Sequence, residues 1–523
     1  MGPARRVLFT AAAYNAPVQV AVSGGTVEGT IRRGLRMWRA IPYAAPPVGK
    51  RRFRSPAPVV PWEGIRDARS FGAIAPQDRN GQFRARTNAL MSEDCLTVNV
   101  IAPAHDIAAL RPVMVFVHGG AYSVGSSREI HKQGETLVRE GDIVFINFNY
   151  RLGALGYLDF TSFSTKRRKF ESNLGLRDQV AALRWVHDNI AAFGGDPDNV
   201  TVFGESAGGN AVTTLMTVPS AAGLFARAIA QSPPPNAIYP AEIAAGWARD
   251  FVELLSETVD NSSTESTAPE DVGGLLAGAS VDELVAATTR LQLRLPDAAP
   301  GTIALCPVID GVFLPERPLD AFKAGRAHPV PLIIGTNDRE GSLFRGRLDI
   351  LATTPPRIRA IFAKTRKRSR RALRAQYPGL PKRRAAADFG GDYAFWYPSV
   401  KVAERHARFA PVYFYRFDIA PRLLRLAGLD ATHGLELFAL FDRMDGVFGR
   451  GLGALGGRRP FKRAGERMRS DWLQFARTGS VSDRWPRYTV RKRRTLIIDR
   501  VDRIEFDPRG DRRVAWQDFV PHV

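Results

Sequence analysis

Residues 199–216 read Asn-Val-Thr-Val-Phe-Gly-Glu-Ser-Ala-Gly-Gly-Asn-Ala-Val-Thr-Thr-Leu-Met: a β-prone run, a glycine-flanked turn and a helix-prone run in direct succession. The pattern Gly204-x-Ser206-x-Gly208 alone is weak in a chain with 47 glycines, so the flanking strand and helix carry the inference. A serine on so sharp a turn needs small neighbours, because the backbone is strained and a reacting carbonyl must approach closely. Ser206 is therefore predicted to be a nucleophile at a helix N-terminus, where the helix dipole favours a developing negative charge.

A second turn offers the hydrogen-bond donors that acyl transfer requires. His118-Gly119-Gly120 directly follows the apolar run 113–117. Glycines there let main-chain N–H groups point into a site without obstruction, and the residue after the nucleophile, Ala207, donates a further N–H. We expect Gly119, Gly120 and Ala207 to form an oxyanion hole, although the glycine pair by itself is also typical of a plain turn at a strand end.

Apolar runs alternate with helix-prone segments after residue 95. This alternation is typical of a mainly parallel sheet that is covered by helices on both faces, and it predicts the α/β class. The first hundred residues instead alternate short β-prone runs with turns, which indicates an antiparallel lead-in. The apolar runs lie at 113–117, 143–147, 200–203, 332–334, 412–417 and 496–498.

Further stretches of the chain match one known family of hydrolases. They are Ile41-Pro-Tyr-Ala44, Pro46-Pro-Val-Gly49, Ser92-Glu-Asp-Cys-Leu96, His118-Gly-Gly-Ala121, Asn149-Tyr-Arg-Leu-Gly153, Asn173-Leu-Gly-Leu-Arg-Asp-Gln179, Phe193-Gly-Gly-Asp-Pro197 and the serine turn. Over nearly its whole length the chain resembles the type-B carboxylesterase and cholinesterase family of α/β-hydrolases, and within it the bacterial carboxylesterases. The resemblance implies the α/β-hydrolase fold and a serine carboxylesterase.

The resemblance also implies a triad acid. The family has a glutamate in a segment that here reads Gly335-Thr-Asn-Asp-Arg-Glu-Gly-Ser342, which assigns Glu340. The residues alone leave Asp338 equally open, because either carboxylate could orient an imidazole.

His433-Gly434 follows the run 412–417 and matches the family's His-Gly, which makes His433 the expected base. The chain order Ser, Glu, His is the order typical of this fold. His118 is the weaker alternative, because it precedes the serine in a tight turn. The implied mechanism has His433 deprotonate Ser206, Glu340 fix the imidazole tautomer, and water hydrolyse the acyl-enzyme.

Three positions depart from the family pattern. Secreted members pair the cysteine of the Ser-Glu-Asp-Cys segment with an upstream cysteine whose place is taken here by Ala75, so Cys95 is expected to be a free, buried thiol. Residues 75–90 contain no tryptophan, so the platform that cholinesterases use for a quaternary ammonium is missing and a choline-ester preference is not expected. Gln231-Ser-Pro-Pro-Pro235 replaces the more usual serine–glycine turn near the site.

Composition sets the broad class. The 523 residues are 45% hydrophobic and 24% charged, as in an ordinary globular enzyme. Two cysteines without a Cys/His cluster predict neither a disulfide framework nor a metal site. The apolar run 7–13 is short for a signal peptide, and no run reaches the roughly 18 to 20 residues of a membrane span, so we expect a cytoplasmic protein.

The formal net charge of +22 raises the question of polyanionic partners. The strongest basic runs lie at 364–374, 382–384 and 491–494. No nucleic-acid-binding motif accompanies them, so no specific nucleic acid is expected. A solvated surface is the main interpretation, and contact with anionic membranes is the alternative.

One domain is expected over residues 1–523, because the site residues span most of the chain. Loop insertions are expected at about 256–274 and 446–457. The second contains Gly451-Leu-Gly-Ala-Leu-Gly456, a formal dinucleotide pattern. No strand is expected before it, so we predict a flexible loop and no cofactor.

The expected function is hydrolysis of small to medium uncharged carboxylic esters. One alternative is a lipase or polyester hydrolase that docks on anionic interfaces. A second is a non-catalytic, cholinesterase-like binding protein, which the presence of Ser206, Glu340 and His433 opposes. The sequence does not disclose acyl or alcohol specificity.

Overall fold

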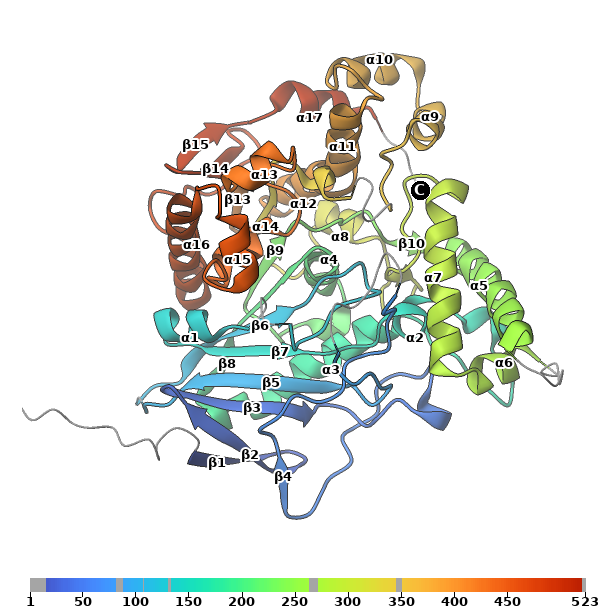
Figure 1. Ribbon diagram of the computed structural model, residues 1–523, viewed down its shortest axis with the longest axis vertical. Helices are drawn as coiled ribbons and strands as arrows, with labels where there is room; N and C mark the ends of the chain where they lie inside the picture. The colour runs from blue at the N-terminus through green and yellow to red at the C-terminus, as the bar shows by residue number, and fades with distance from the viewer. Residues whose placement is uncertain are drawn as a thin grey trace, which may run out of the picture.

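The computed structural model describes residues 16–80, 88–106, 108–129, 133–262, 271–344 and 350–519, and a large mixed sheet lies at its centre (Figure 1). The strands of this sheet are β1 (Ala16–Val22), β2 (Gly25–Arg32), β3 (Leu35–Pro42), β4 (Ile65–Asp67), β5 (Thr97–Pro103), β6 (Arg111–Val117), β7 (Val144–Phe148), β8 (Gly195–Glu205), β9 (Arg227–Gln231), β12 (Leu332–Asn337), β13 (Val412–Phe417), β14 (Arg494–Ile498) and β15 (Arg503–Phe506). A separate two-stranded sheet pairs β10 (Tyr239–Pro240) with β11 (Val308–Ile309).

The large sheet has the order β1-β2-β3-β5-β7-β6-β8-β9-β12-β13-β14-β15, and β4 pairs with β2. All neighbours from β7 to β14 in this order are parallel. The β1, β2, β3 and β5 strands pair antiparallel, which confirms the predicted lead-in. The expected α/β class with a mainly parallel centre is likewise confirmed.

Strand β6 shows why these apolar runs form central strands. Val113, Val115 and Val117 pack into one hydrophobic core, whereas Met114 and Phe116 pack into a second core on the opposite face. Side chains alternate between the two faces of a strand, so a continuous apolar run suits a strand that is covered on both sides.

The helices form the two covering layers and the outer insertions. Their bounds are α1 (Glu135–Gly141), α2 (Gly153–Tyr157), α3 (Leu174–Asn189), α4 (Ala207–Leu215), α5 (Ala241–Ser262), α6 (Val272–Gly278), α7 (Val281–Ala298), α8 (Pro318–Ala324), α9 (Pro355–Ala363), α10 (Lys367–Ala375), α11 (Arg383–Gly391), α12 (Tyr397–His406), α13 (Arg422–Leu426), α14 (Leu435–Leu440), α15 (Val447–Leu452), α16 (Arg458–Thr478) and α17 (Gly510–Gln517). Shorter turns are η2 (Gly49–Arg51), η4 (Thr161–Phe163), η5 (Ile190–Phe193), η6 (Pro219–Ala221), η7 (Glu340–Ser342) and the π-helical η8 (Asp392–Trp396).

Helices α3, α4 and α12 contribute side chains to the first core, and α1, α14 and α16 contribute to the second. Helices α5, α6 and α7 stand at one edge of the molecule, and α9 and α10 lie at the top of the same view (Figure 1). Among the described helices, none combines the length and apolar character that crossing a bilayer requires.

The prediction of a loop at 256–274 is wrong for its described residues. Helix α5 continues to Ser262, because Phe251 and Leu255 keep one face of the helix in the core. Helix α6 then begins after Asp271, whose side chain accepts a hydrogen bond from the N–H of Gly274. Residues 263–270 lie outside the described part of the chain.

The prediction of a loop at 446–457 is also partly wrong. Helix α15 forms within it, and Leu452 packs into the second core, so a short apolar anchor stabilises the helix despite the glycines. The helix α14, rather than a strand, precedes the formal dinucleotide pattern.

Strand β9 was missed by the sequence analysis. Its residues, Arg-Ala-Ile-Ala-Gln, give only a weak β signal. Neighbours on both sides, β8 and β12, nevertheless make it a central strand, and its end lies beside the serine turn.

Candidate active site

Ser206 lies on a sharp turn between β8 and α4, as predicted. Its φ of 59° is in the left-handed region, which costs a non-glycine residue about 1–3 kcal/mol. The turn is fixed by the N–H of Ser206, which donates to the carbonyl of Gln231 at the end of β9 over 2.9 Å. Gly208 leaves no room for a side chain, since a Cβ there would be 2.1 Å from the carbonyl oxygen of Val117.

The His118-Gly119-Gly120 turn is packed directly against the serine turn. A Cβ on Gly119 would be 3.0 Å from the Cβ of Ser206 and 2.4 Å from the carbonyl oxygen of Glu205. Gly120 has a φ of 122°, and a Cβ there would be 2.0 Å from the carbonyl oxygen of Val124. Both positions therefore require glycine, and the first brings main chain to the side of Ser206.

Ala207 is the first residue of α4 and is buried. The first N–H groups of a helix have no carbonyl partner within the helix, so this donor suits an oxyanion. Tyr150 holds the His118-Gly119-Gly120 turn in place. Its hydroxyl donates a hydrogen bond to the carbonyl of His118 over 2.6 Å, and its ring stacks on the imidazole of His118.

Glu340 and His433 meet although 93 residues separate them in the chain. Nδ1 of His433 lies 2.5 Å from Oε2 of Glu340. The other carboxylate oxygen accepts hydrogen bonds from the N–H of Asn337 at 2.5 Å and from the hydroxyl of Ser232 at 2.6 Å. Glu340 is 3% exposed, so these donors replace the water that a carboxylate would otherwise bind.

Nε2 of His433 faces the serine turn and lies 3.3 Å from Oε1 of Glu205, the residue before Ser206. No hydrogen bond joins the imidazole to the Ser206 hydroxyl among the described contacts. The structure thus joins the predicted acid and base directly, and brings the base to the neighbour of the predicted nucleophile.

Two further buried carboxylates, Glu205 and Glu436, surround the imidazole. Burial by itself lowers the pKa of His433, but the negative charges of Glu205 and Glu340 outweigh it and raise that pKa to about 9. Burial, together with Glu205 and Glu340, raises the pKa of Glu436 to about 8. The side-chain amide of Asn337 donates to Glu436, which orients that carboxyl group.

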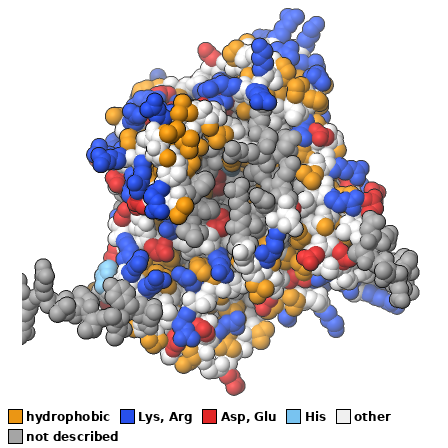
Figure 2. Space-filling view, in the orientation of Figure 1, with side chains coloured by type: hydrophobic (Ala, Val, Ile, Leu, Met, Phe, Trp, Pro, Cys, Tyr) orange, Lys and Arg blue, Asp and Glu red, His pale blue; other side chains and the backbone are white. Residues whose placement is uncertain are grey.

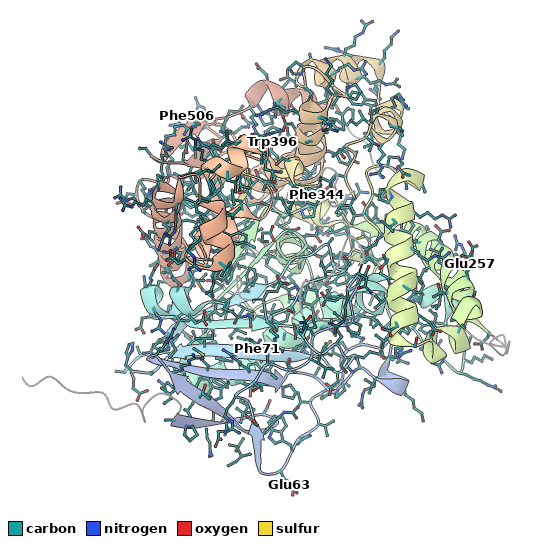
Figure 3. All side chains as sticks on the ribbon, viewed as in Figure 1. Glu63, Phe71, Glu257, Phe344, Trp396 and Phe506 are labelled. Carbon is teal, nitrogen blue, oxygen red and sulfur yellow. The ribbon has the colours of Figure 1, made fainter. Side chains whose placement is uncertain are left out.

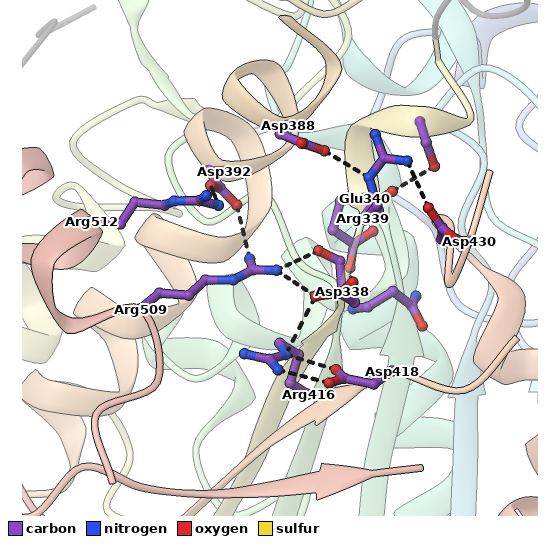
Figure 4. Close-up of polar contacts among 12 residues, drawn as sticks. Asp338, Arg339, Glu340, Asp388, Asp392, Arg416, Asp418, Asp430, Arg509 and Arg512 are labelled. Atoms are coloured by element: carbon purple, nitrogen blue, oxygen red, sulfur yellow. Dashed lines mark hydrogen bonds and ion pairs between the residues drawn. The ribbon is translucent and has the colours of Figure 1, made fainter. Parts of the chain in front are cut away.

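Asp338 points away from the imidazole. Its Oδ1 lies 2.6 Å from Arg509 and 3.6 Å from Arg416 (Figure 4). Arg339, between the two carboxylates, pairs with Asp388 and Asp430 on the other side of the turn. Of the two carboxylates that the sequence left open, Glu340 is the one that contacts His433.

Aromatic side chains form an apolar wall beside the imidazole. The rings of Phe344 and Phe395 lie 5.0 Å and 4.5 Å from that of His433, between centroids, and Figure 3 marks Phe344 near the middle of the molecule. Ile350 and Leu351 belong to the same hydrophobic cluster. The chain after Glu340 thus supplies one wall of the site.

The prolines at 233–235 lie beside α4, the helix that follows Ser206. All three are buried, and the carbonyl of Pro234 accepts a 2.7 Å hydrogen bond from the side chain of Asn210 on α4. The carbonyl of Pro233 accepts another from Ser399 on α12.

The sequence analysis missed Ser232, Glu205, Asn337 and Glu436. Glu205 stands inside the quoted serine turn, and Ser232 stands inside the quoted segment Gln231-Ser-Pro-Pro-Pro235, so both had a local signal. Asn337 and Glu436 become recognisable only when the strand end and α14 are placed side by side.

Both cysteines are free and buried, which confirms the prediction for Cys95. Within the described ranges, no group of three or more His, Cys, Asp or Glu side chains has the arrangement of a metal site. The tryptophan-free segment 75–90 lies partly outside the described residues, at 81–87.

A parallel sheet with a serine turn between a central strand and a helix defines the α/β-hydrolase fold. The chain belongs to the carboxylesterase family, whose model matches residues 16–514. It is 35% identical over 506 residues to the para-nitrobenzyl esterase of Bacillus subtilis, covering 94% of this chain and 96% of the relative.

Two solved structures are closely similar. A para-nitrobenzyl (PNB) esterase matches with a TM-score of 0.81 and 34% identity over 95% of this chain and 99% of its own. A carboxylesterase of Geobacillus stearothermophilus matches with a TM-score of 0.79 and 32% identity over 95% and 100%. The protein is thus a serine carboxylic-ester hydrolase rather than a non-catalytic binding protein.

Proposed function

We propose that ester hydrolysis proceeds through a triad of Ser206, His433 and Glu340. The contact between Nδ1 of His433 and Oε2 of Glu340 carries this proposal, because it holds the imidazole in the tautomer whose Nε2 accepts a proton. His433 takes the hydroxyl proton of Ser206 as the serine oxygen attacks the ester carbonyl, and passes it to the leaving alcohol. Water, deprotonated by His433, then releases the acid from the acyl-enzyme.

The tetrahedral oxyanion is stabilised by main-chain N–H groups at two turns. The packing of Gly119 against Ser206 and the position of Ala207 at the start of α4 support this assignment. Donors that are fixed before reaction stabilise the transition state more than the substrate. The proposed donors are Gly119, Gly120 and Ala207.

Small to medium uncharged esters are the proposed substrates. The buried carboxylates Glu205, Glu340 and Glu436 disfavour an anionic substrate, and the rings of Phe344 and Phe395 favour an apolar one. The name of the Bacillus subtilis relative points to nitrobenzyl esters, which belong to the same class.

Replacing Ser206 by Ala tests the proposal. Turnover of a p-nitrophenyl ester is expected to fall by about 10⁶, with a residual rate of about 10³ to 10⁴ over water from the oxyanion donors and substrate binding. The matched control is Ser220→Ala, an exposed serine in η6, which is expected to leave turnover unchanged.

Covalent labelling is a second test of whether Ser206 is the nucleophile. A phosphonate ester is expected to modify one serine per molecule and abolish activity, and peptide mapping is expected to find the adduct on Ser206. An adduct on another serine, or a loss below tenfold in Ser206→Ala, would place the nucleophile elsewhere.

A further inference from the structure

The corner formed by α9 and α10 carries the densest positive charge of the chain. Residues 364–374 contain seven lysines and arginines and no acid. Only Ser369 and Leu373 of α10 are buried, so nearly the whole helix faces solvent. Figure 2 shows the resulting blue projections at the top of the molecule, over α10 of Figure 1.

These cations differ from many arginines elsewhere in the protein. Arg467, Arg484 and Arg503, for example, each pair with at least one carboxylate. None of the seven cations at 364–374 forms an ion pair with a described carboxylate. Arg370 instead donates to the carbonyls of Thr365 and Ala363, at 2.6 and 3.1 Å. Adjacent cations without carboxylate partners repel one another, and an anionic partner bound here would relieve that repulsion.

A groove of about 420 Å³ lies between α9 and α10, and half of the residues that line it are apolar. Its apolar side suits a hydrocarbon chain, and its guanidinium groups suit a phosphate or carboxylate. The lining residues are Pro355, Ile358, Phe362, Ala363 and Pro381 on the apolar side, and Arg359, Lys367, Arg370, Arg371 and Arg374 on the charged side.

We propose that this corner docks the protein on an anionic membrane surface, with the groove holding the headgroup and upper acyl chain of one lipid. More cations surround the groove than a single headgroup can neutralise, namely Lys364, Arg366, Arg368, Lys382 and Arg383, all exposed. A bilayer presents many anions at once and matches this excess. The proposal is independent of the ester chemistry.

A nucleic acid fits the same surface less well. Proteins that bind single strands stack bases on exposed aromatic rings, but the two aromatics of residues 355–384, Phe362 and Tyr377, are buried. The apolar side of the groove would also have no partner in a phosphate backbone. A lipid can contact both sides of the groove, with its acyl chain on the apolar side and its headgroup on the charged side.

The docking corner is connected to the active site through the chain. Helix α9 follows the wall that begins at Phe344, and α11 packs against the η7 turn that holds Glu340. An enzyme held at this corner would work where apolar esters partition, at the surface of the bilayer.

The test compares two variants of equal charge. The groove variant carries Arg359→Gln, Lys367→Gln and Arg371→Gln, and the control carries Arg487→Gln, Arg491→Gln and Lys492→Gln, three exposed cations that do not line this groove. Binding is measured by flotation with phosphatidylcholine vesicles, with or without about 30% phosphatidylglycerol. Turnover of a soluble p-nitrophenyl ester shows that both variants are folded.

We expect the wild type to bind the anionic vesicles, to ignore the neutral ones and to dissociate as salt is raised. The groove variant is expected to bind on the order of 100-fold more weakly, because it lacks three cations and each cation near an anionic surface contributes about fivefold. The control variant is expected to bind nearly as the wild type does.

A single variant, Ala363→Glu, tests the groove itself. A carboxylate at this exposed lining position would pair with the neighbouring cations and is expected to weaken vesicle binding. Equal affinity of the groove and control variants, or wild-type binding by Ala363→Glu, would overturn the proposal. Tighter binding to DNA than to anionic vesicles at physiological salt would replace it with a nucleic-acid surface.

Discussion

Glu340 accepts hydrogen bonds from three elements at once, through His433, Asn337 and Ser232. Together these donors leave the carboxylate one orientation. Asp338, two residues earlier, is one-third exposed and pairs with arginines instead. The two carboxylates therefore have different partners: Glu340 contacts the imidazole of His433, and Asp338 belongs to a network of ion pairs.

Substituting Glu340 and Asp338 one at a time measures how much each carboxylate contributes to kcat. Glu340→Gln is expected to lower kcat by about 10⁴, because the amide no longer stabilises the imidazolium or its tautomer. Asp338→Asn removes only a partner of the ionic network, so kcat is expected to fall several-fold at most. Steady-state kinetics on a p-nitrophenyl ester measures both, and the opposite ranking would transfer the role to Asp338.

The pKa of His433 predicts the pH dependence of activity. The base acts only when neutral, so kcat/KM is expected to rise with pH as His433 loses its proton, near pH 9 rather than near 6.5. Glu205→Gln removes the largest influence that raises this pKa, so the rise is expected at lower pH.

The control for this experiment is Glu63→Gln, an exposed glutamate at the lower edge of Figure 3, far from the site. Its kcat/KM profile between about pH 5 and 10 is expected to match that of the wild type. A Glu205→Gln profile that also matched would contradict the assigned influence.

The turns at Ser206 and at Gly119-Gly120 were predictable because their signals are local. Small residues in a short segment mark a strained turn wherever the segment lies. The choice between Asp338 and Glu340 was not predictable from the residues alone, since both can orient an imidazole. It depends on η7 and the turn of His433 before α14 being brought together, as does the position of Glu436.

Among the elements, the strands of the parallel sheet were the most predictable, because burial on both faces requires continuous apolar runs. Strand β9 was the exception, since an alanine-rich segment becomes a strand only through its neighbours β8 and β12. The helical ends of the two expected insertions were missed for a related reason: a few apolar side chains, such as Leu452, contact a core that the local composition does not reveal.

The turn at Gly119-Gly120, the proposed source of oxyanion donors, depends on the shape of its backbone. Gly120→Ala places a Cβ 2.0 Å from the carbonyl oxygen of Val124, at a φ of 122°, so the main chain must move. The expected result is a kcat lower by about 10² to 10³, the effect of losing one oxyanion donor. Unfolding free energy is expected to fall by about 1–3 kcal/mol.

Gly451→Ala is the matched control, because a Cβ at this helical position of α15 meets nothing within 4 Å. Activity is expected to stay unchanged, and stability to rise by up to about 1 kcal/mol from improved helix propensity. If Gly120→Ala behaved in the same way, the turn would not depend on glycine.

At the scale of the whole molecule, one ionic network joins distant parts of the chain around the site. Arg509 pairs with Asp338, 171 residues away, and with Asp392 in η8, while its guanidinium lies 5.6 Å from the ring of Trp396 (Figure 4). Asp338 also approaches Arg416 on β13. Such pairing cannot be predicted from sequence, because any of 74 cations can meet any of 52 acids until the fold is known.

Other expectations at this scale stay predictions. These are a single domain over residues 1–523, a cytoplasmic location, and activity without a metal or cofactor. The network of Arg509 bears on the first, because it connects the segment before α17 to the turn of Glu340.

Removing the guanidinium in Arg509→Gln tests how far this network supports the site. The change leaves Asp392, whose side chain is 7% exposed, with Arg512 and the Tyr377 hydroxyl, and it leaves Asp338 with the more distant Arg416. Loss of one partner from a partly buried pair is expected to lower the unfolding free energy by roughly 2 to 4 kcal/mol, which denaturant titration measures. Because Asp338 precedes Glu340 by two residues, kcat is expected to fall several-fold while KM changes little.

Arg500→Gln is the control. Arg500 is an exposed arginine nearby that forms no ion pair among the described residues, so its substitution is expected to change neither the unfolding free energy nor kcat. Equal stability and kcat in the two variants would mean that Glu340 is held by its own hydrogen bonds alone, without support from the C-terminal segment.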